Sequence, residues 1–255
     1  MKQWRHDRHA SQLELASIAN SSQRHVSFLE SGRSQPSRGM VLALAEALDL
    51  PLRARNELLA AAGFAPFYPE RALASADLAG ARAILERILL HHDPYPAFVL
   101  DVGWNLLMHN RAAGRLIRLC VPASGVGESL VGINFLRLMC DPAGMRPFIA
   151  SWPMTGRALL ARLRREAATH PRSAVGRLLD ELIERDAFPR FVEPEDEPVD
   201  VTIPVEFAVG ARRIRLINTL TTFGTPQDVS VQELRIEMSF PADDESERLL
   251  RELSA

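Results

Sequence analysis

Helical periodicity fills the first quarter of the chain, and the spacing within residues 12–29 restricts the fold more than any other feature. Two helices cross at a sharp angle only where a small residue lets them approach and the turn accepts a left-handed backbone. Ala16 holds the small position, and Asn20 holds the turn, where glycine is commonest and asparagine is tolerated. Val26 and Leu29 follow at the spacing of a buried helix face. The spacing therefore predicts a helix-turn-helix.

The same pattern continues to residue 63. Ser22 is a good N-cap for the second helix of the pair, and Gly63 follows the last apolar helix as its C′ residue. No strand alternation interrupts this region, which is therefore predicted as an all-α unit over residues 1–63. Five helices are expected, and four of them cover 11–19, 22–30, 40–48 and 53–62.

The rest of the chain mixes helices and strands. Residues 64–75 contain Pro66 and Pro69 and are predicted as a linker. Residues 76–242 are predicted as an α+β domain in which helices and a five-stranded antiparallel sheet enclose a small pocket, a PAS-like arrangement. Residues 243–255 are predicted as an acidic C-terminal tail with a short helix. The expected strands cover 97–101, 104–108, 199–209, 212–223 and 229–240.

Composition excludes several classes of protein. Hydrophobic residues make up 47% of the chain and charged residues 24%, which is too much apolar surface for a disordered chain. The formal net charge of −2 excludes a protein that coats nucleic acid along its whole length. Cys120 and Cys140 are too few for a disulfide framework or a cysteine-based zinc site. A cytoplasmic protein is expected, because the N-terminus lacks a signal-peptide core and no apolar stretch approaches about 20 residues.

The sequence carries no pattern of a known catalytic centre. It has no nucleophile elbow, no P-loop and no HExxH motif, so no enzyme activity, cofactor or metal is expected. His91-His92-Asp93 is interpreted as a polar helix end rather than a metal site.

The second helix of the predicted pair leaves polar side chains opposite its buried face. Gln23 and Arg24 carry groups that form bidentate hydrogen bonds with adenine and guanine edges in the major groove. Phe28 offers contact with a thymine methyl group, and Gln12 begins the preceding helix, where its amide can meet a phosphate. Residues 1–39 hold six basic and three acidic side chains, an excess of the sign that DNA requires. This face predicts binding to double-stranded DNA.

The motifs around this face resemble the Cro/C1-type (XRE) repressor domain over roughly residues 3–63. The matching residues are Ser11-Gln12-x-x-Leu15-Ala16, Ser27-x-Leu29-Glu30-x-Gly32-Arg33 and Pro36-Ser37. Asn20 departs from the glycine that is usual in that family. Because one such domain reads only a few base pairs, a homodimer is expected. The resemblance implies that six side chains face DNA: Gln12, Ser22, Gln23, Arg24, Ser27 and Phe28.

The remainder of the chain resembles the MmyB-like regulators, which join a repressor-type domain to a PAS-like ligand-binding domain. The resemblance covers most of the chain. It implies a sequence-specific transcription regulator that senses a small apolar ligand, for which fatty-acid-like molecules have been suggested. The matching segments are 96–101, 110–113, 163–167 with His170-Pro171, and 223–228.

An apolar pocket with a cationic rim would suit the carboxylate of a fatty acid. Arg164, His109 and Arg111 are the rim candidates. The alternative for each apolar residue is the ordinary core of an α+β domain, and for each rim residue a surface ion pair. The predicted ligand-binding residues are Phe98, Leu100, Trp104, Met108, His109, Phe135, Met139, Trp152, Arg164 and Leu220.

The favoured hypothesis is that the ligand biases the packing of a helix over 76–91 and so changes the spacing of two DNA-binding heads. One alternative is a constitutive DNA binder whose second domain only dimerises, which a tightly packed interior would favour. Another is an enzyme with a DNA-binding head, which would turn over its ligand.

Overall fold

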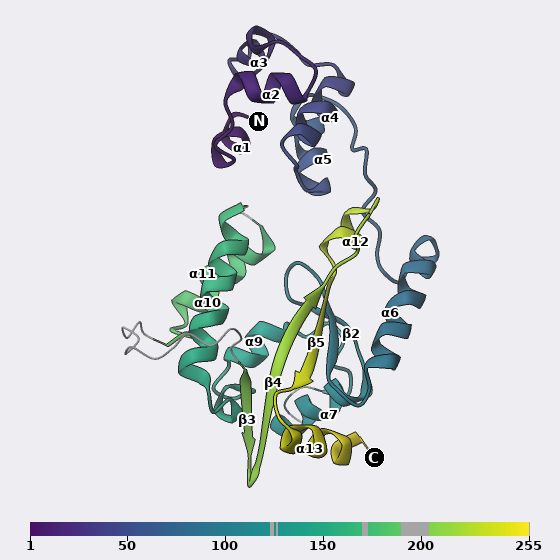
Figure 1. The fold of residues 1–255 in the computed structure, drawn as a ribbon, viewed down its shortest axis with the longest axis vertical. Helices are drawn as coiled ribbons and strands as arrows, with labels where there is room; N and C mark the ends of the chain where they lie inside the picture. The colour runs from purple at the N-terminus through teal and green to yellow at the C-terminus, as the bar shows by residue number, and fades with distance from the viewer. Residues whose placement is uncertain (123–124, 126, 170–172, 190–203, 255) are drawn as a thin grey trace. The chain divides into compact units, whose positions relative to one another are not determined.

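The computed structural model describes residues 1–122, 125, 127–169, 173–189 and 204–254. These residues form two compact units (Figure 1). The first unit consists of Met1–Leu78 together with Phe223–Gln232. The second consists of Ala79–Thr222 and Glu233–Ala255. Each unit is described by itself below.

The first unit is helical, and its predicted helices are found at their predicted places. Gly63 follows the last of them with a positive φ of 84°, as expected of a C′ residue. The buried core includes Leu15, Val26, Leu44 and Leu59. The helices are α1 (Lys2–Asp7), α2 (Gln12–Ile18), α3 (Gln23–Glu30), α4 (Arg38–Ala47), α5 (Leu52–Ala61) and, from the later segment, α12 (Val229–Glu233).

Local hydrogen bonds at the N-termini explain where three of these helices begin. The Ser11 hydroxyl accepts from Glu14 N, and the Glu14 carboxylate accepts from Ser11 N, which makes a capping box for α2. The Ser22 and Ser37 hydroxyls accept backbone N–H bonds at the starts of α3 and α4. The helix starts are thus fixed by residues that the sequence shows directly.

The second unit contains a five-stranded sheet with the strand order β2-β1-β5-β4-β3. Every neighbouring pair is antiparallel, so the predicted α+β fold class is confirmed. On β1, which lies between β2 and β5, Val99 pairs with Met108 on one side and Ile236 on the other. The strands are β1 (Ala97–Leu100), β2 (Leu106–His109), β3 (Val205–Val209), β4 (Arg212–Thr221) and β5 (Arg235–Pro241).

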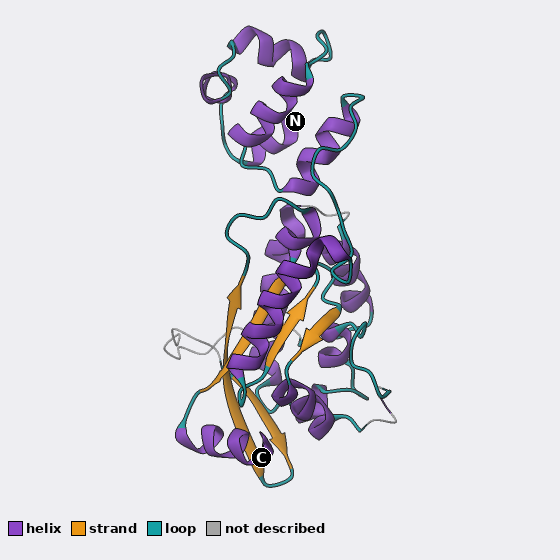
Figure 2. Ribbon diagram, turned by 90° about the vertical axis from the view of Figure 1, so that its right-hand side faces the viewer, coloured by secondary structure: helices purple, strands orange, loops and turns teal. Residues whose placement is uncertain are grey.

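Helices cover the sheet on both faces. Figure 2 shows α6 lying across one face, and in Figure 1 helices α9 to α11 lie on the other side of the strands. Asn110 begins α7, because its side chain accepts from Ala113 N, and it also accepts from Ala97 N of β1. The helices are α6 (Ala79–His92), α7 (Arg111–Cys120), α9 (Phe135–Cys140), α10 (Trp152–Thr169), α11 (Ala174–Glu184) and α13 (Asp244–Ser254), with 3₁₀ turns η1 (Ala76–Leu78) and η2 (Arg146–Phe148).

Only the second part of the segment expected as a strand over 229–240 is a strand, β5. The first part of the segment is helix α12, because the Asp228 carboxylate accepts from Ser230 N and Val231 N and so starts a helical turn. The alternation on β5 is also incomplete, since Glu237 and Ser239 are buried on the face expected to be polar and exposed. Of the strand expected over 199–209, the part before residue 204 lies outside the described residues.

Two segments that the sequence left outside the domains pack against them. In residues 64–75, the backbone N–H groups of Phe67 and Tyr68 donate to the Asn56 side chain on α5. In residues 243–255, helix α13 contacts β4 and α7 and places Leu249 and Leu250 in the core of the second unit.

Candidate functional site

The turn between α2 and α3 has the geometry that the spacing predicts. Ala16 is 1% exposed and Val26 is fully buried, so the two helices meet at these side chains. Asn20 has a positive φ of 50°, the left-handed conformation expected at the turn. The helix-turn-helix is therefore confirmed.

The outer side of α3 carries the predicted DNA face. Ser22, Gln23 and Arg24 are exposed, whereas Ser27 and Phe28 are half-buried. The Arg24 guanidinium carbon lies 5.3 Å from the centre of the Phe28 ring, one helical turn away. This stacking keeps the fork of Arg24 over the helix surface and leaves its N–H donors for a partner. The face offers polar groups suited to base edges and an aromatic ring beside them.

Gln12 is held by a buried ion pair that sequence reasoning missed. Its Nε2 donates to Glu30 Oε2 at 2.8 Å. Glu30 in turn accepts from Arg5 Nε at 2.8 Å and Nη2 at 3.0 Å, and its side chain is 3% exposed. The hydrogen bonds from Arg5 hold the pKa of the Glu30 carboxyl below its ordinary value. The Gln12 amide is therefore oriented from within the unit, and its contact with a phosphate stays a prediction.

The predicted ligand-binding residues separate into a buried group and an exposed group. Five of them lie in one apolar cluster of the second unit, where the Phe98 and Phe135 rings are 4.7 Å apart. Trp152 is partly buried and packs against this cluster. Arg164 is exposed and Leu220 is 49% exposed, so neither joins it. The five buried members are Phe98, Leu100, Trp104, Phe135 and Met139.

Met108 and His109 are half-buried on β2, and Arg111 is exposed at the start of α7. The His109 ring lies against Gly114, where an added Cβ would come within 3.0 Å of Cε1. His109 Nδ1 is 2.8 Å from Asn110 O. The His109 ring thus packs against α7, and a cationic rim of His109, Arg111 and Arg164 stays a prediction.

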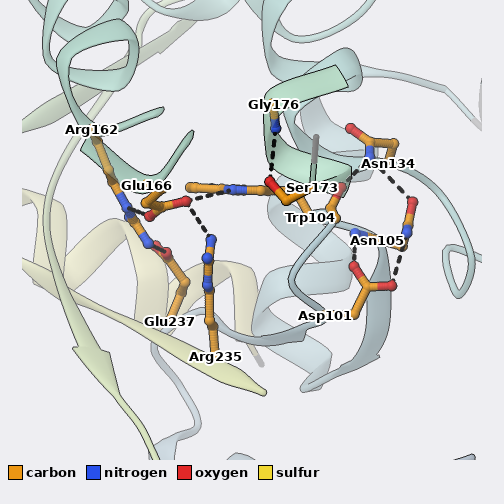
Figure 3. Close-up of polar contacts among 11 residues, drawn as sticks. Asp101, Trp104, Asn105, Asn134, Arg162, Glu166, Ser173, Gly176, Arg235 and Glu237 are labelled. Atoms are coloured by element: carbon orange, nitrogen blue, oxygen red, sulfur yellow. Dashed lines mark hydrogen bonds and ion pairs between the residues drawn. The ribbon is translucent and has the colours of Figure 1, made fainter. Parts of the chain in front are cut away.

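Trp104 is the most unusual member of the buried group. Its side chain is fully buried although its backbone has a positive φ of 65°, which is strained for a bulky residue. The Asp101 carboxylate accepts from Asn105 N and Nδ2, each at 2.8 Å, and Asn134 Nδ2 donates to Gly103 O at 2.7 Å (Figure 3). These polar bonds hold the turn between β1 and β2 that carries Trp104.

Charged side chains from α10 and β5 surround the Trp104 ring (Figure 3). The guanidinium carbons of Arg162 and Arg235 lie 4.5 and 5.6 Å from a ring centre. Glu166 accepts from Arg162 at 3.0 Å and from Arg235 at 2.7 Å, and Trp104 Nε1 points to it at 3.4 Å. Arg162 Nη2 and Glu237 Oε1 are buried and 2.6 Å apart. We call these five residues the Trp104 network.

The Trp104 network carries two positive and two negative side chains, so it is electrically balanced. Burial lowers the pKa of Arg162, but Glu237 and Glu166 more than offset that effect and the pKa is raised. Sequence reasoning missed the network although a signal was present. Arg162 and Glu166 share a face of a helix, and Arg235 shares a face of a strand with Glu237.

The two cysteines are free and buried in the second unit. Burial raises the pKa of Cys120 and of Cys140 to about 12, so both stay as thiols at neutral pH. No group of three metal-ligating side chains is found among the residues that the structure describes. Within the same residues, no helix is both long and apolar enough to cross a membrane.

Two family models match the chain. A helix-turn-helix model matches residues 1–54, and the model of the MmyB-like transcription regulator ligand binding domain matches residues 81–253. Both describe domains of transcription regulators and neither describes an enzyme.

The chain has no match among curated proteins. A solved structure described as an RNA-binding light-oxygen-voltage receptor aligns at 16% identity with a TM-score of 0.29, over 95% of this chain and 56% of that one. The chain thus spans little more than half the length of that receptor. Because the ligand-binding-domain model matches well over half of its residues, the chain belongs to the family of MmyB-like transcription regulators, with an XRE-type helix-turn-helix ahead of the ligand-binding domain.

Proposed function

We propose that this DNA-binding regulator docks α3 in the major groove and reads bases with Gln23 and Arg24. The observation that supports this most is the left-handed turn at Asn20, which places α3 with its polar face exposed beside a capped N-terminus. Phe28 lies under Arg24 and is positioned for a thymine methyl group, while Ser22 and Ser27 border the same face.

Replacement of Arg24 by alanine tests the reading of bases. On a duplex selected from a random pool, Arg24→Ala should weaken binding by about 1–3 kcal/mol and relax the preference at one base pair. Arg248→Ala, which removes an exposed arginine of the second unit, is the matched control and should leave affinity unchanged. A loss that is equal on all duplexes, with a shallower salt dependence, would show phosphate contact only and would contradict base reading.

We propose that the protein acts as a homodimer on two half-sites. One helix-turn-helix reads few base pairs, and paired heads read half-sites separated by about 34 Å, one turn of the double helix. Footprinting should therefore show two protected half-sites. Analytical ultracentrifugation of the complex should give the mass of two chains per duplex. One chain on a single protected half-site would reject the dimer.

We propose that the second domain is a PAS-like sensor of a small apolar ligand, and a fatty acid fits best. The cluster around Phe98, Leu100, Phe135 and Met139 supplies apolar surface of the kind that would suit an acyl chain. Extraction of the purified protein followed by mass spectrometry should release a lipid, and palmitate should raise the unfolding temperature of the stripped protein. If neither occurs, a domain that only dimerises is favoured instead.

A further inference from the structure

The connection between β4 and β5 belongs to a different unit from the strands it joins. β4 and β5 are neighbours in the sheet of the second unit, whereas residues 223–232 are part of the first unit. Neighbouring antiparallel strands need only two to five residues to turn. A longer connection that folds into the other unit needs a separate explanation.

Residues 223–232 are held firmly inside the first unit. Val229 N donates to Pro69 O at 2.8 Å, and Val229 and Val231 are 1% and 8% exposed. Gln232 Oε1 accepts from Leu52 N at 2.6 Å. Leu52 is the first residue of α5, and Pro51 gives that helix no side-chain cap. Gln232 therefore caps α5 from a position far along the chain.

Asp228 fixes the shape of the segment and its place. The carboxylate, in a residue that is 5% exposed, caps α12 and lies 3.4 Å from Arg71 Nη1. Arg71 also pairs with Asp77 at 3.1 Å. The segment is thus tied to the stretch that leads out of the first unit at Leu78.

The contacts continue within the first unit towards α4. The Asn56 side chain on α5 accepts from Phe67 N and Tyr68 N and donates to Tyr68 O at 2.7 Å. The Phe67 ring lies 5.3 Å from the guanidinium carbon of Arg38 in the first turn of α4. A continuous set of contacts therefore joins residues 223–232 to two helices of the DNA-binding unit.

We propose that residues 223–232 couple the ligand-binding domain to the DNA-binding unit. The chain passes between the units at Leu78–Ala79, Thr222–Phe223 and Gln232–Glu233, so a shift of β4 against β5 pulls on the capped start of α5. Ligand and DNA then influence each other through this segment, and that influence is reciprocal. The role of the ligand rests on the function proposed above, whereas the coupling to DNA does not.

The test compares an uncoupled variant with two controls in the full-length protein. Asp228→Asn with Gln232→Ala removes the ion pair and the cap of α5. Gln227→Ala changes an exposed residue of the same segment, and Gln232→Glu keeps an acceptor oxygen for Leu52 N. Loss of the cap should speed amide exchange at the start of α5 roughly fivefold. Gln227→Ala and Gln232→Glu should leave that rate near the wild-type value.

The decisive measurement is hydrogen exchange in β4 and β5 with and without a selected duplex. DNA should slow exchange of these strands in the wild type and in both controls, and this protection should disappear in the uncoupled variant. Strands that DNA does not protect, or protection that survives in the uncoupled variant, would overturn the proposal.

Palmitate separates the coupling from the proposed ligand. If palmitate leaves DNA affinity unchanged while DNA still protects β4 and β5 in a segment-dependent way, the fatty-acid proposal fails and the coupling is supported. If palmitate shifts DNA affinity equally in the wild type and the uncoupled variant, the ligand proposal holds and the coupling fails.

Discussion

The two units each contain a buried ion-pair network, and the two networks differ in how far apart their members lie in the chain. In the first unit Arg5 and Glu30 are 25 residues apart and join α1 to α3. In the second unit Glu166 and Arg235 are 69 residues apart and join α10 to β5 across the Trp104 ring. The first network connects two helices that lie close together near the start of the sequence. The second exists only once the sheet has assembled, so it depends on the whole second unit.

The networks also differ in how many partners each charge has. Arg5 has one carboxylate, that of Glu30, beside the carbonyl oxygen of Ala10. Arg162 has two, because Glu166 and Glu237 both lie within 3.0 Å of it. Removal of one carboxylate should therefore cost more in the first unit than in the second. The predictions below test this difference, and each needs a domain-resolved probe because two units need not unfold together.

Glu30→Ala should have the largest effect. It leaves the Arg5 guanidinium covered and without a carboxylate, and because the unit is small and the pair lies close beneath its surface we expect the low end of the usual cost, about 3 kcal/mol. Urea unfolding followed by hydrogen exchange in α1 to α3 measures it. Equal stability of the variant and the wild type would show that the pair contributes nothing.

Glu237→Ala should destabilise the second unit by a smaller amount, about 2 kcal/mol, because Arg162 keeps Glu166. The exchange of amides in β5 and α10 reports this change. The double variant Arg162→Met with Glu237→Leu replaces the pair by apolar groups and should recover most of the loss. A cost above that of Glu30→Ala would reverse the proposed order of the two networks.

The pH dependence of the first unit should show the smallest effect. The Arg5 hydrogen bonds lower the pKa of Glu30, so its contribution to stability is full above the unfolded pKa near 4.5. That contribution falls as the pH drops through the lower folded pKa. Glu30→Gln should remove this part of the acid sensitivity in unfolding curves measured between neutral and acid pH. An unchanged pH profile would show that Glu30 does not titrate with folding.

Local patterns predicted much of the fold. Ser11, Ser22 and Asn110 mark helix starts, and Asn20 takes the left-handed turn that the spacing requires. Each of the five strands overlaps a range in which a strand was expected. The alternation over 229–240 misled because valine favours a strand, whereas the Asp228 carboxylate accepts from Ser230 N and Val231 N and starts a helix.

The exposed face of α3 could be predicted from the sequence, but the arginine of α10 that meets Trp104 could not. The outer face of α3 follows from its buried face, so Gln23 and Arg24 are exposed as expected. On α10 the arginine chosen from the sequence was Arg164, which is exposed, whereas Arg162 reaches Trp104. Residues two apart on a helix point to nearly opposite sides, and the sequence does not show which side meets the sheet.

The sequence by itself determined the helix-turn-helix, its caps and the antiparallel strands, because these depend on residues a few positions apart and leave a periodic pattern. Only the tertiary structure decided that charged faces of α10 and β5 meet around Trp104, and that residues 223–232 pack with the first unit. Those outcomes depend on burial and pairing between residues far apart in the chain, and such contacts leave no regular spacing to read.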